Sequence, residues 1–381
     1  MKIIEIKLLL LSVLLCVHTS FAFAEDNTYL SEKEIAGAET VEFDSTHWEF
    51  IGKATKVEEH LGRKSLEGMA LLKGIEFCNG IIEMDVACKG GREFAGILFR
   101  IKPGLLTSDR NYSDSEQFYL RPHKSGLPDA LQYTPMFNGQ TCWQLYSGDG
   151  FIAEAEIPYK RWFHLKMEIS GTQARVFLDN SSEPDLIIND LKQGDSKGAI
   201  AIYGSFPGQT HFSNFSFEPK DNLKFDAPPE PVEAPGALTQ WRITQVFSPD
   251  SIDTEKSPAA QNLSGIDWKD VRGEPSGLLN VSRYRLLKGR GCVLAKTIVY
   301  SDSAQIKKLE FGYSDKISIL LNRRILFTGD SSFRSRDPLF LGVAGLNDAV
   351  YLPLQKGENE LLLIVSESMG GWGFISKLTD R

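Results

Sequence analysis

The chain has 381 residues, of which 42% are hydrophobic, and its formal net charge is −8. This length and apolar content are sufficient for two domains with full cores. An acidic chain without a basic cluster argues against nucleic acid as the partner.

The first 24 residues have the pattern of an export signal. Lys2 and Lys7 precede an apolar run over residues 8–17, and residues 22–24 form a small-x-small cleavage site. The apolar run is too short to span a bilayer comfortably, and no later stretch reaches the ~20 apolar residues that a membrane helix needs. We therefore expect an exported protein, periplasmic or extracellular, without a membrane span.

Residues 25–219 are predicted to form a first domain built of strands. Runs such as 80–87 and 162–169 alternate apolar and polar residues, and turn signals such as Asn138-Gly139 separate them. Many short strands at this spacing are typical of an all-β sandwich, and helical periodicity is almost absent.

Two runs within residues 94–146 alternate most clearly. Because strand side chains point to opposite faces in turn, one face of the sheet should be apolar and the other polar. The apolar face should carry Ile97, Phe99, Phe118 and Leu120, and the opposite face Leu98, Arg100, Gln117, Tyr119 and Arg121.

Residues 220–239 interrupt the strand pattern. They contain four prolines in an acidic stretch, which favours an extended, semi-rigid linker. Residues 240–381 return to short alternating runs, for example 316–321 and 360–366. We therefore predict a second β-sandwich domain after the linker.

Four cysteines follow the leader, namely Cys78, Cys88, Cys142 and Cys292. A strand over residues 80–87 would hold Cys78 and Cys88 roughly 33 Å apart at ~3.3 Å per residue, too far for a disulfide. A bridge from Cys142 to one of them and free buried thiols both remain open. No Cys-x-x-Cys pair or Cys/His cluster indicates zinc.

The first domain resembles the concanavalin A-like lectin/glucanase jelly roll of the LamG type. Its run YLRPHKSGLPDALQYTPMFNGQTCWQLY is similar to one found in exported proteins near the 3-keto-disaccharide hydrolase-like domains. The runs FGYSDKISILLNRRILFTGDSSFRSRD and GGWGF in the second domain resemble the galactose-binding-like β-sandwich, an accessory module in glycosidases. These folds host many functions, so the resemblance defines the fold better than the activity.

The glucanase branch of this superfamily carries a Glu-x-Asp-x-x-Glu motif on one strand. Here Glu83 and Asp85 match its beginning, but Cys88 stands where the second glutamate belongs. A retaining glycosidase needs two carboxyl groups about 5–5.5 Å apart, so the motif is broken. The simpler interpretation is that Glu83 and Asp85 form the solvated face of an antiparallel strand.

A set of planar and aromatic side chains near the two central strands is the better candidate for ligand binding. Such groups can bond sugar hydroxyls and cover apolar sugar faces, and arginine can also bind carboxylate or sulfate. The alternative is that the arginines pair with acids and that the aromatic rings are core. The candidate ligand-binding residues are Arg100, Gln117, Tyr119, Arg121, His123, Gln132, Tyr133 and Trp143.

Other groups offer less specific signals. Glu116 and Asp149 are the candidates for an acid/base pair, and loop acids such as Asp114 and Asp129 suit calcium, although no Asp-x-Asp-x-Asp loop is present. His60, His164 and His211 have no partner at metal or triad spacing in the sequence, so no metal ligand and no cofactor is assigned.

In the second domain a loop carries Asp330, Arg334, Arg336 and Asp337, which could bind a glycan end or form salt bridges.

These observations favour an exported carbohydrate-binding protein whose partner is a carbohydrate or polysaccharide. A glycoside hydrolase or lyase, with Glu116 or Asp149 near Arg121, is the first alternative. A protein–protein adhesion module is the second, because LamG-type sandwiches also bind proteins. On the sequence alone, enzymatic activity is the less favoured reading.

Overall fold

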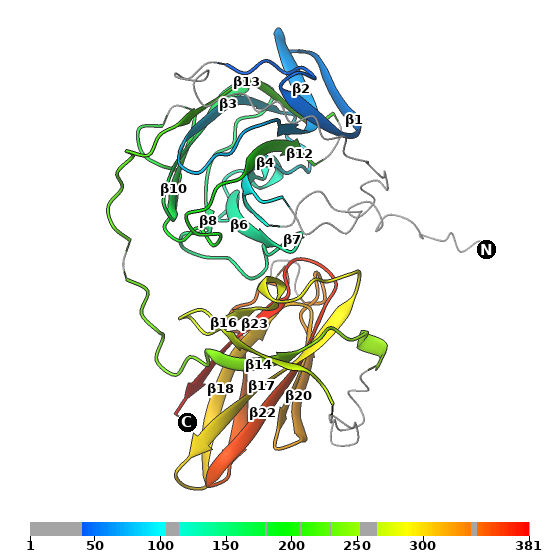
Figure 1. The fold of residues 1–381 in the computed structure, drawn as a ribbon, viewed down its shortest axis with the longest axis vertical. Coiled ribbons are helices and arrows are strands. Elements are labelled where there is room, and N and C mark those ends of the chain that lie inside the picture. The colour runs from blue at the N-terminus through cyan, green and yellow to red at the C-terminus, as the bar shows by residue number, and fades with distance from the viewer. Residues whose placement is uncertain are drawn as a thin grey trace, which may run out of the picture.

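A computed structural model describes residues 40–103, 114–179, 181–205, 208–228, 230–251, 265–336 and 341–380. The predicted leader and Asp337 lie outside these residues. Almost all regular structure in the described part of the chain is strand, as Figure 1 shows. The prediction of an all-β protein is therefore confirmed. No helix among the described residues has the length and hydropathy needed to cross a membrane.

The N-terminal strands form one continuous, curled sheet. Within the described residues its strands are β1 (Trp48–His60), β2 (Arg63–Leu72), β3 (Gly80–Cys88), β4 (Ala95–Ile101), β5 (Ser115–Leu120), β6 (Leu131–Phe137), β7 (Gln140–Thr141), β8 (Ile152–Ala153), β9 (Trp162–Ser170), β10 (Gln173–Leu178), β11 (Leu186–Ile188), β12 (Ala199–Gly204) and β13 (Thr210–Pro219). A 3-10 turn, η1 (Pro122–Lys124), follows β5.

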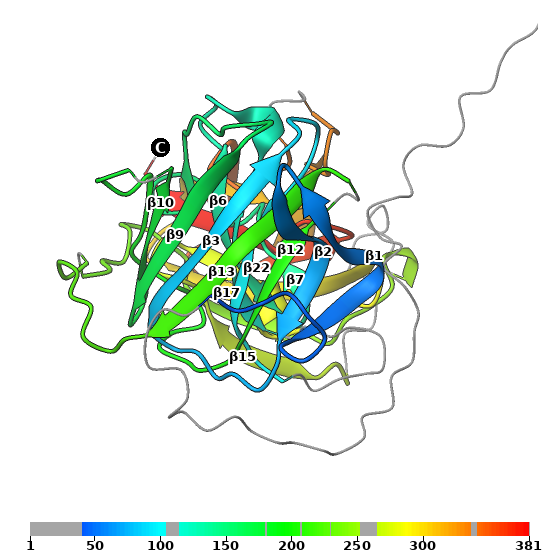
Figure 2. The same ribbon diagram turned by 90° about the horizontal axis from the view of Figure 1, so that it is seen from above.

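The order of this sheet is β11-β10-β9-β3-β13-β2-β12-β4-β5-β6-β7, with β1 against β2 and β8 against β6. Strand β2 joins the two halves, since Glu67 and Leu66 pair with β13 while residues 69–71 pair with β12. The curled sheet encloses one apolar core (Figure 1). Seen from above in Figure 2, β9, β3 and β13 lie side by side and present their outer face.

The expected alternation around β4 and β5 is present. Ile97, Phe99, Phe118 and Leu120 are fully buried in the core between the sheet halves. Leu98 belongs to a separate small cluster on the opposite face. A period of two in the sequence therefore identifies the core face correctly here.

The C-terminal strands form two further sheets. Within the described residues they are β14 (Gln240–Thr244), β15 (Trp268–Arg272), β16 (Leu278–Asn280), β17 (Gly291–Ser301), β18 (Gln305–Tyr313), β19 (Lys316–Leu321), β20 (Arg324–Asp330), β21 (Asp348–Leu354), β22 (Gly357–Glu367) and β23 (Gly373–Thr379), with 3-10 turns η2 (Pro249–Ser251) and η4 (Val281–Arg283).

One of these sheets has the order β15-β14-β17-β22-β19-β20 and the other β16-β23-β18-β21. The two pack around an apolar core that includes Trp241, Phe311 and Trp372. Trp372 is fully buried, and its indole N–H donates to the backbone oxygen of Val365 at 3.1 Å. The last described strand, β23, belongs to this second β-sandwich.

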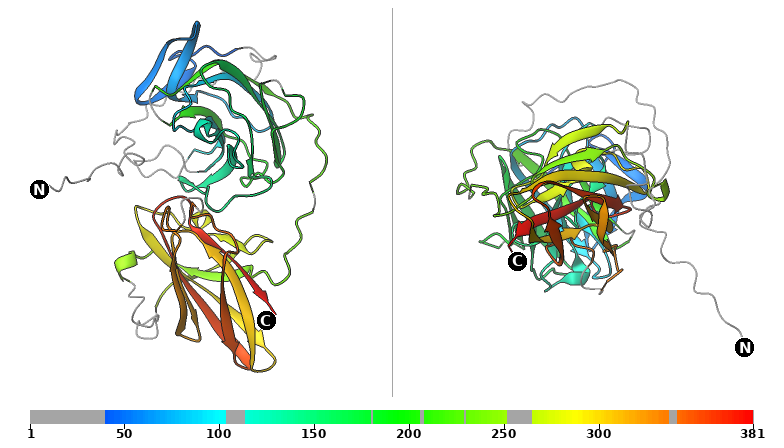
Figure 3. Two further views of the ribbon diagram at one scale, coloured as in Figure 1. Left: turned by 180° about the vertical axis from the view of Figure 1, so that it is seen from behind. Right: turned by 90° about the horizontal axis from the view of Figure 1, so that it is seen from below.

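In the proline-rich segment, residues 220–228 lie beside the N-terminal sandwich and residues 230–239 beside the C-terminal one, as Figures 1 and 3 show. Ser170 donates to the oxygen of Leu223 at 2.9 Å, and Gln173 to the oxygen of Asp226 at 3.1 Å. Further along, Ala237 forms a bridge with Lys377 of β23. The described residues of this segment are therefore attached to strands of both sandwiches.

The two sandwiches meet through the loop that follows β7. Cys142, Leu145 and Tyr146 form a buried apolar cluster with Leu278 of the C-terminal part. The Tyr146 hydroxyl donates to Glu274 at 2.6 Å, and Lys192 forms an ion pair with the same carboxylate at 2.7 Å. Apolar packing and charge thus join the sandwiches directly.

The four cysteines after the leader are all free. Cys88, Cys142 and Cys292 are buried, and Cys78 is partly exposed. Of the two alternatives that the sequence left open, free thiols are present and a bridge from Cys142 is not. Burial raises the pKa of the Cys142 thiol to about 12, which keeps it protonated and unreactive.

Candidate functional site

Three of the predicted ligand residues form one hydrogen-bonded network on the outer face of β5 and β6, and a fourth, Gln117, is bonded separately on the same face. The Tyr119 hydroxyl donates to Gln132 Oε1 at 2.7 Å, and Arg121 donates to both Tyr119 and Gln132. Gln117 donates to the Tyr203 hydroxyl at 2.6 Å. Gln117, Tyr119 and Arg121 therefore lie on the common face that the alternation predicts.

This network is closed rather than open to a ligand. Gln132 accepts two hydrogen bonds at Oε1 and donates two from Nε2, to the oxygens of Trp143 and Tyr146 at 3.0 and 2.9 Å. Tyr119, Arg121 and Gln132 are at most 5% exposed. Burial raises the pKa of Tyr119 to about 12. The hydrogen-bonding capacity of these groups is therefore used inside the protein. Gln132 joins the sheet to the loop after β7.

Arg100 does not lie on this face. A bulge opposite Ala199 and Ala201 places Arg100 in the left-handed region, with φ of 52°. Its guanidinium is fully buried and donates to the oxygens of Cys78, Gly171 and Gly194 and to Asn79 Oδ1. The extra residue in the bulge redirects the side chain toward the edge of the sandwich, so Arg100 holds three loops together.

Tyr133 and Glu116 point into the core instead of outward. Tyr133 pairs with Phe118 in the sheet and is fully buried. Its hydroxyl donates to Glu116 Oε2 at 2.7 Å, while the backbone N–H of Gln193 donates to Glu116 Oε1 at 2.8 Å. Burial raises the pKa of Glu116 to about 7. A carboxyl enclosed in this way cannot reach a substrate in solvent.

Asp149, the other candidate for an acid/base pair, lies exposed in the turn before β8. Glu116 is enclosed and Asp149 is exposed, so the two do not share a cleft. Among the loop acids considered for calcium, Asp129 pairs with Arg121 and Lys124, and Asp114 accepts the backbone N–H of Asn138 at 2.7 Å. Each of these acids has a structural partner.

His123 and Trp143 lie at the margin of the closed network and are partly exposed. His123 accepts a weak hydrogen bond from the N–H of Glu93 at 3.4 Å, and burial lowers its pKa. Its ring meets Phe94 edge to face with centroids 5.4 Å apart. The Trp143 ring contacts the ring of Phe333 in the C-terminal sandwich, with centroids 6.1 Å apart. His123 and Trp143 therefore belong to different ring clusters.

The loop in the second sandwich that could bind a glycan end or form salt bridges follows the salt-bridge alternative in its described residues. Arg336 donates to Asp348 at 2.7 Å and to the Tyr313 hydroxyl at 2.9 Å. Asp330 pairs with Lys316 at 3.2 Å. Arg334 is exposed beside the Phe333 ring.

A polar cluster on the outer face of β3 and β9 is more open. Asp85 and Glu83 lie on β3, and His164 lies opposite them on β9. His164 Nδ1 is 3.0 Å from Asp85, and its Nε2 is 3.5 Å from Glu83. The hydrogen bond with Asp85 is the main reason that the pKa of His164 is raised. We call Glu83, Asp85, His164, Arg63 and Trp162 the outer-face cluster.

Asp85 is the centre of the outer-face cluster. It accepts from Asn214 at 2.7 Å and also pairs with Arg63. Burial alone would raise the pKa of Asp85, but its hydrogen bonds and the charge of Arg63 lower it by more. Arg63 lies over the ring of Trp162 at 5.2 Å. Both Trp162 and His164 are partly exposed, so the cluster combines an indole, an imidazole and carboxylates at the surface.

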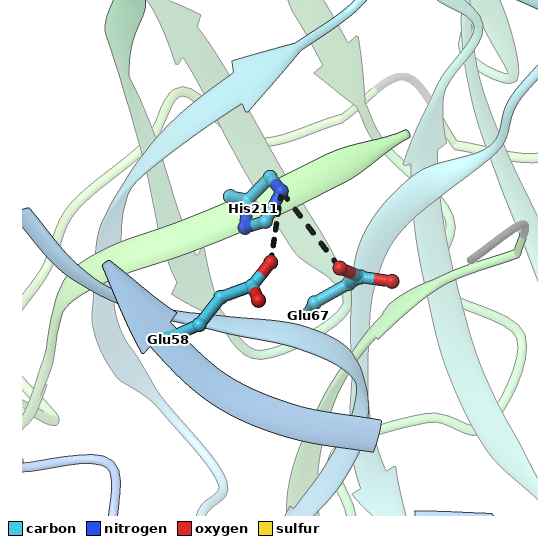
Figure 4. A group of neighbouring side chains, drawn as sticks. All are labelled: Glu58, Glu67 and His211. Atoms are coloured by element: carbon cyan, nitrogen blue, oxygen red, sulfur yellow. Dashed lines mark ion pairs between the residues drawn. The ribbon is translucent and has the colours of Figure 1, made fainter. Parts of the chain in front are cut away.

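A second polar group lies where β1, β2 and β13 meet. Glu58, Glu67 and His211 have one ligand atom each, and these atoms all lie within 4.8 Å of one another (Figure 4). His60 stacks on His211 with ring centroids 3.7 Å apart. Burial, followed by the charge of His60, lowers the pKa of His211 to about 4. His60 also meets Trp162 edge to face at 6.0 Å.

The three histidines, which have no partner at metal or triad spacing in the sequence, do have partners in the fold. His164 lies between two carboxylates, and His60 stacks on His211. Strand pairing brings these groups together, because His164 is opposite Asp85 and His211 is opposite Glu67. The alternation of Glu83 and Asp85 with apolar residues indicated that these two acids share an exposed face of a strand. No local pattern indicated that His164, 79 residues after Asp85, would be their partner.

No protein-family model matches the chain, and no curated protein matches it either. Among solved structures it is similar to a carbohydrate-binding module, CBM66, from Bacillus subtilis, with 17% identity over 43% of this chain and 91% of that one, at a TM-score of 0.30. It is also similar to the galectin LEC-6 of Caenorhabditis elegans, with 12% identity over 46% and 99% of the chains and a TM-score of 0.27.

A third similar structure is SCLam, a non-specific endo-β-1,3(4)-glucanase of family GH16. It has 9% identity over 53% of this chain and 95% of that one, at a TM-score of 0.29. Likeness at this level carries no conclusion about what this chain binds, because one fold serves many functions. The argument for function therefore rests on the side chains described above.

Proposed function

We propose that the protein is a carbohydrate-binding protein and that the outer-face cluster is its binding surface. The observation that supports this is the partly exposed Trp162 beside Arg63, Asp85 and His164. An indole covers the apolar C–H face of a sugar ring, and the carboxylates and imidazole exchange hydrogen bonds with its hydroxyls. The same proposal includes export by the predicted leader, so that the protein binds carbohydrate outside the cytoplasm.

The charges of the cluster favour a neutral glycan. Arg100 and Arg121 were the groups that would have suited carboxylate or sulfate, and both are buried among internal partners. Arg63 is committed to Asp85. Glu83 and Asp85 would repel an acidic sugar, so hydroxyl groups are the better match.

The test is calorimetry of the purified chain with neutral and with sulfated polysaccharides, together with an assay for reducing-end release. We expect binding to a neutral polysaccharide without release. Trp162→Ala should weaken that binding by at least tenfold, whereas Trp143→Ala, beside the closed network, should leave it unchanged.

Three results would overturn the proposal. Binding that is lost in Trp143→Ala but kept in Trp162→Ala would move the site to the β5–β6 face. Release of reducing ends would make the protein an enzyme. A complete lack of binding across both classes of polysaccharide would remove carbohydrate as the ligand.

A further inference from the structure

Two carboxylates and one imidazole converge from three strands at one end of the N-terminal sheet. Glu58 lies on β1, Glu67 on β2 and His211 on β13 (Figure 4). His211 Nε2 is 4.0 Å from Glu58 Oε1 and 3.9 Å from Glu67 Oε2. We propose that these three side chains form a binding site for a divalent transition-metal ion of the zinc class.

The tautomer of His211 supports this assignment. The Ser65 hydroxyl donates its proton to the backbone oxygen of Glu58 at 3.0 Å and also lies 3.2 Å from His211 Nδ1. Since that proton is already used, the contact with His211 is satisfied when Nδ1 carries the hydrogen. Nε2 then directs its lone pair toward the two carboxylates.

Three electron-pair donors therefore face one another. The distances of 3.9 and 4.0 Å are too long for a proton shared between Nε2 and either carboxylate. A cation placed among the three atoms removes this conflict. Metal-binding histidines have the same arrangement, in which the second ring N–H donates a hydrogen bond to a neighbouring group.

The spacing suits a small ion after a modest adjustment. In a tetrahedral zinc site, bond lengths of about 2.0–2.2 Å place ligand atoms about 3.4 Å apart. Glu58 is the most exposed of the three and can approach by the missing fraction of an ångström. Glu67 is held in place, because the backbone N–H of Gly208 donates to its Oε1. Water would complete the coordination.

The donor set selects against calcium. Calcium takes six to eight oxygen ligands, whereas one nitrogen and two carboxylates are typical of zinc and its neighbours in the first transition row. The site is built rather than superficial, because Glu67 is 3% exposed and His211 is 1% exposed. A metal bound here would hold the β1–β2 hairpin against β13.

Lys56 is the competing cation. Its ammonium group lies 2.8 Å from Glu58 Oε2 and 3.5 Å from Glu67 Oε2. The side chain is 53% exposed and can swing into solvent when a metal arrives. Removal of this charge should therefore strengthen metal binding, which a purely structural ion pair would not predict.

The test uses zinc chloride alone, with the purified chain stripped of metal by a chelator and no glycan present. Calorimetry should give saturable binding of one ion, with no binding of calcium under the same conditions. The unfolding temperature should rise with zinc, since a ligand that binds the folded state stabilises it. Glu67→Gln should weaken zinc binding at least tenfold, and Lys56→Ala should strengthen it.

The outer-face cluster provides a matched control, because His164 also lies between two carboxylates. His164→Asn should leave zinc binding unchanged. If Glu67→Gln does not fold, as judged by circular dichroism, Glu58→Gln at the more exposed ligand takes its place. Absence of saturable zinc binding, binding unaffected by loss of either glutamate, or loss of binding in His164→Asn would each overturn the proposal.

Discussion

The backbone N–H of Gln144 donates a hydrogen bond to the oxygen of Gly370 at 2.9 Å and so joins the two sandwiches. The Gln144 side chain is fully buried between them and donates to the oxygen of Leu341 at 2.9 Å. Its Oε1 accepts from Ser314 at 3.0 Å. Gly370 has φ of 106°, and a Cβ there would lie 2.0 Å from Gln144 Oε1, so only glycine permits this approach.

Gln144→Ala is expected to destabilise the protein by on the order of 2–3 kcal/mol, because it leaves buried partners unsatisfied. It should also loosen the coupling between the sandwiches, so that one unfolding transition becomes two. Urea unfolding followed by fluorescence measures both effects. Gln245→Ala, at an exposed position, is the control and should change little. A single unshifted transition in the Gln144 variant would contradict the prediction.

Glu367 makes this junction sensitive to pH. Burial, with the neighbouring Asp315, raises the pKa of Glu367 to about 8. Ser314 has one hydroxyl proton but lies 3.0 Å from both Gln144 Oε1 and Glu367 Oε2. A protonated Glu367 resolves this, because it donates to Ser314, which then donates to Gln144.

The sign of the pH effect follows from the raised pKa. Between the ordinary pKa of 4.5 and about 8 the folded state holds a proton that the unfolded state has released. The stabilisation is therefore complete below pH 4.5 and is lost as the pH rises through 8. Glu367→Gln should remove this loss, so that the variant is more stable than the wild type above pH 8.

Urea unfolding at a series of pH values measures the effect. The exposed Glu358→Gln is the matched control. If Glu367→Gln and the wild type lose stability in parallel as the pH rises, Glu367 is not the group responsible.

Arg100→Lys is expected to cost about 3 kcal/mol or more in stability. Lysine keeps the charge but lacks the planar fork that reaches Cys78, Gly171 and Asn79 at once. Thermal and urea unfolding measure the loss, and Arg92→Lys at an exposed position is the control. An unchanged stability with reduced glycan binding would instead restore Arg100 to the ligand-binding face.

Local alternation was sufficient to predict the core around β4 and β5. Ile97 and Phe118 are buried, while Gln117 and Tyr119 point to the opposite face, as a period of two requires. The same rule failed at Arg100, because the bulge shifts the register by one residue and a bulge has no marker in the sequence.

The candidate sites were harder to predict than the core. Glu67 and His211 are 144 residues apart and meet only because β2 and β13 pair. A single sequence carries no signal for which distant strands become neighbours. Tyr133 illustrates a second difficulty, since it is adjacent to Gln132 and so must face the other way, into the core.

Asp85 controls the charge of His164 in the outer-face cluster. The hydrogen bond from His164 to Asp85 is the first cause of the raised pKa of this imidazole, with Glu83 adding to it. Asp85→Asn should lower the pKa of His164, since it removes the hydrogen-bonded carboxylate that is the main cause of the raised pKa. An NMR titration of the imidazole carbon-bound protons measures this value directly.

The distant Asp129→Asn should leave the His164 titration unchanged, because Asp129 pairs with Arg121 and Lys124 on another part of the sheet. A His164 whose pKa is the same in the wild type and in Asp85→Asn would show that the two side chains are not bonded in solution. A raised pKa also means that His164 adds stability at acidic pH, and this contribution is lost as the pH rises through that pKa. In Asp85→Asn this pH-dependent part of the stability should shrink together with the NMR shift.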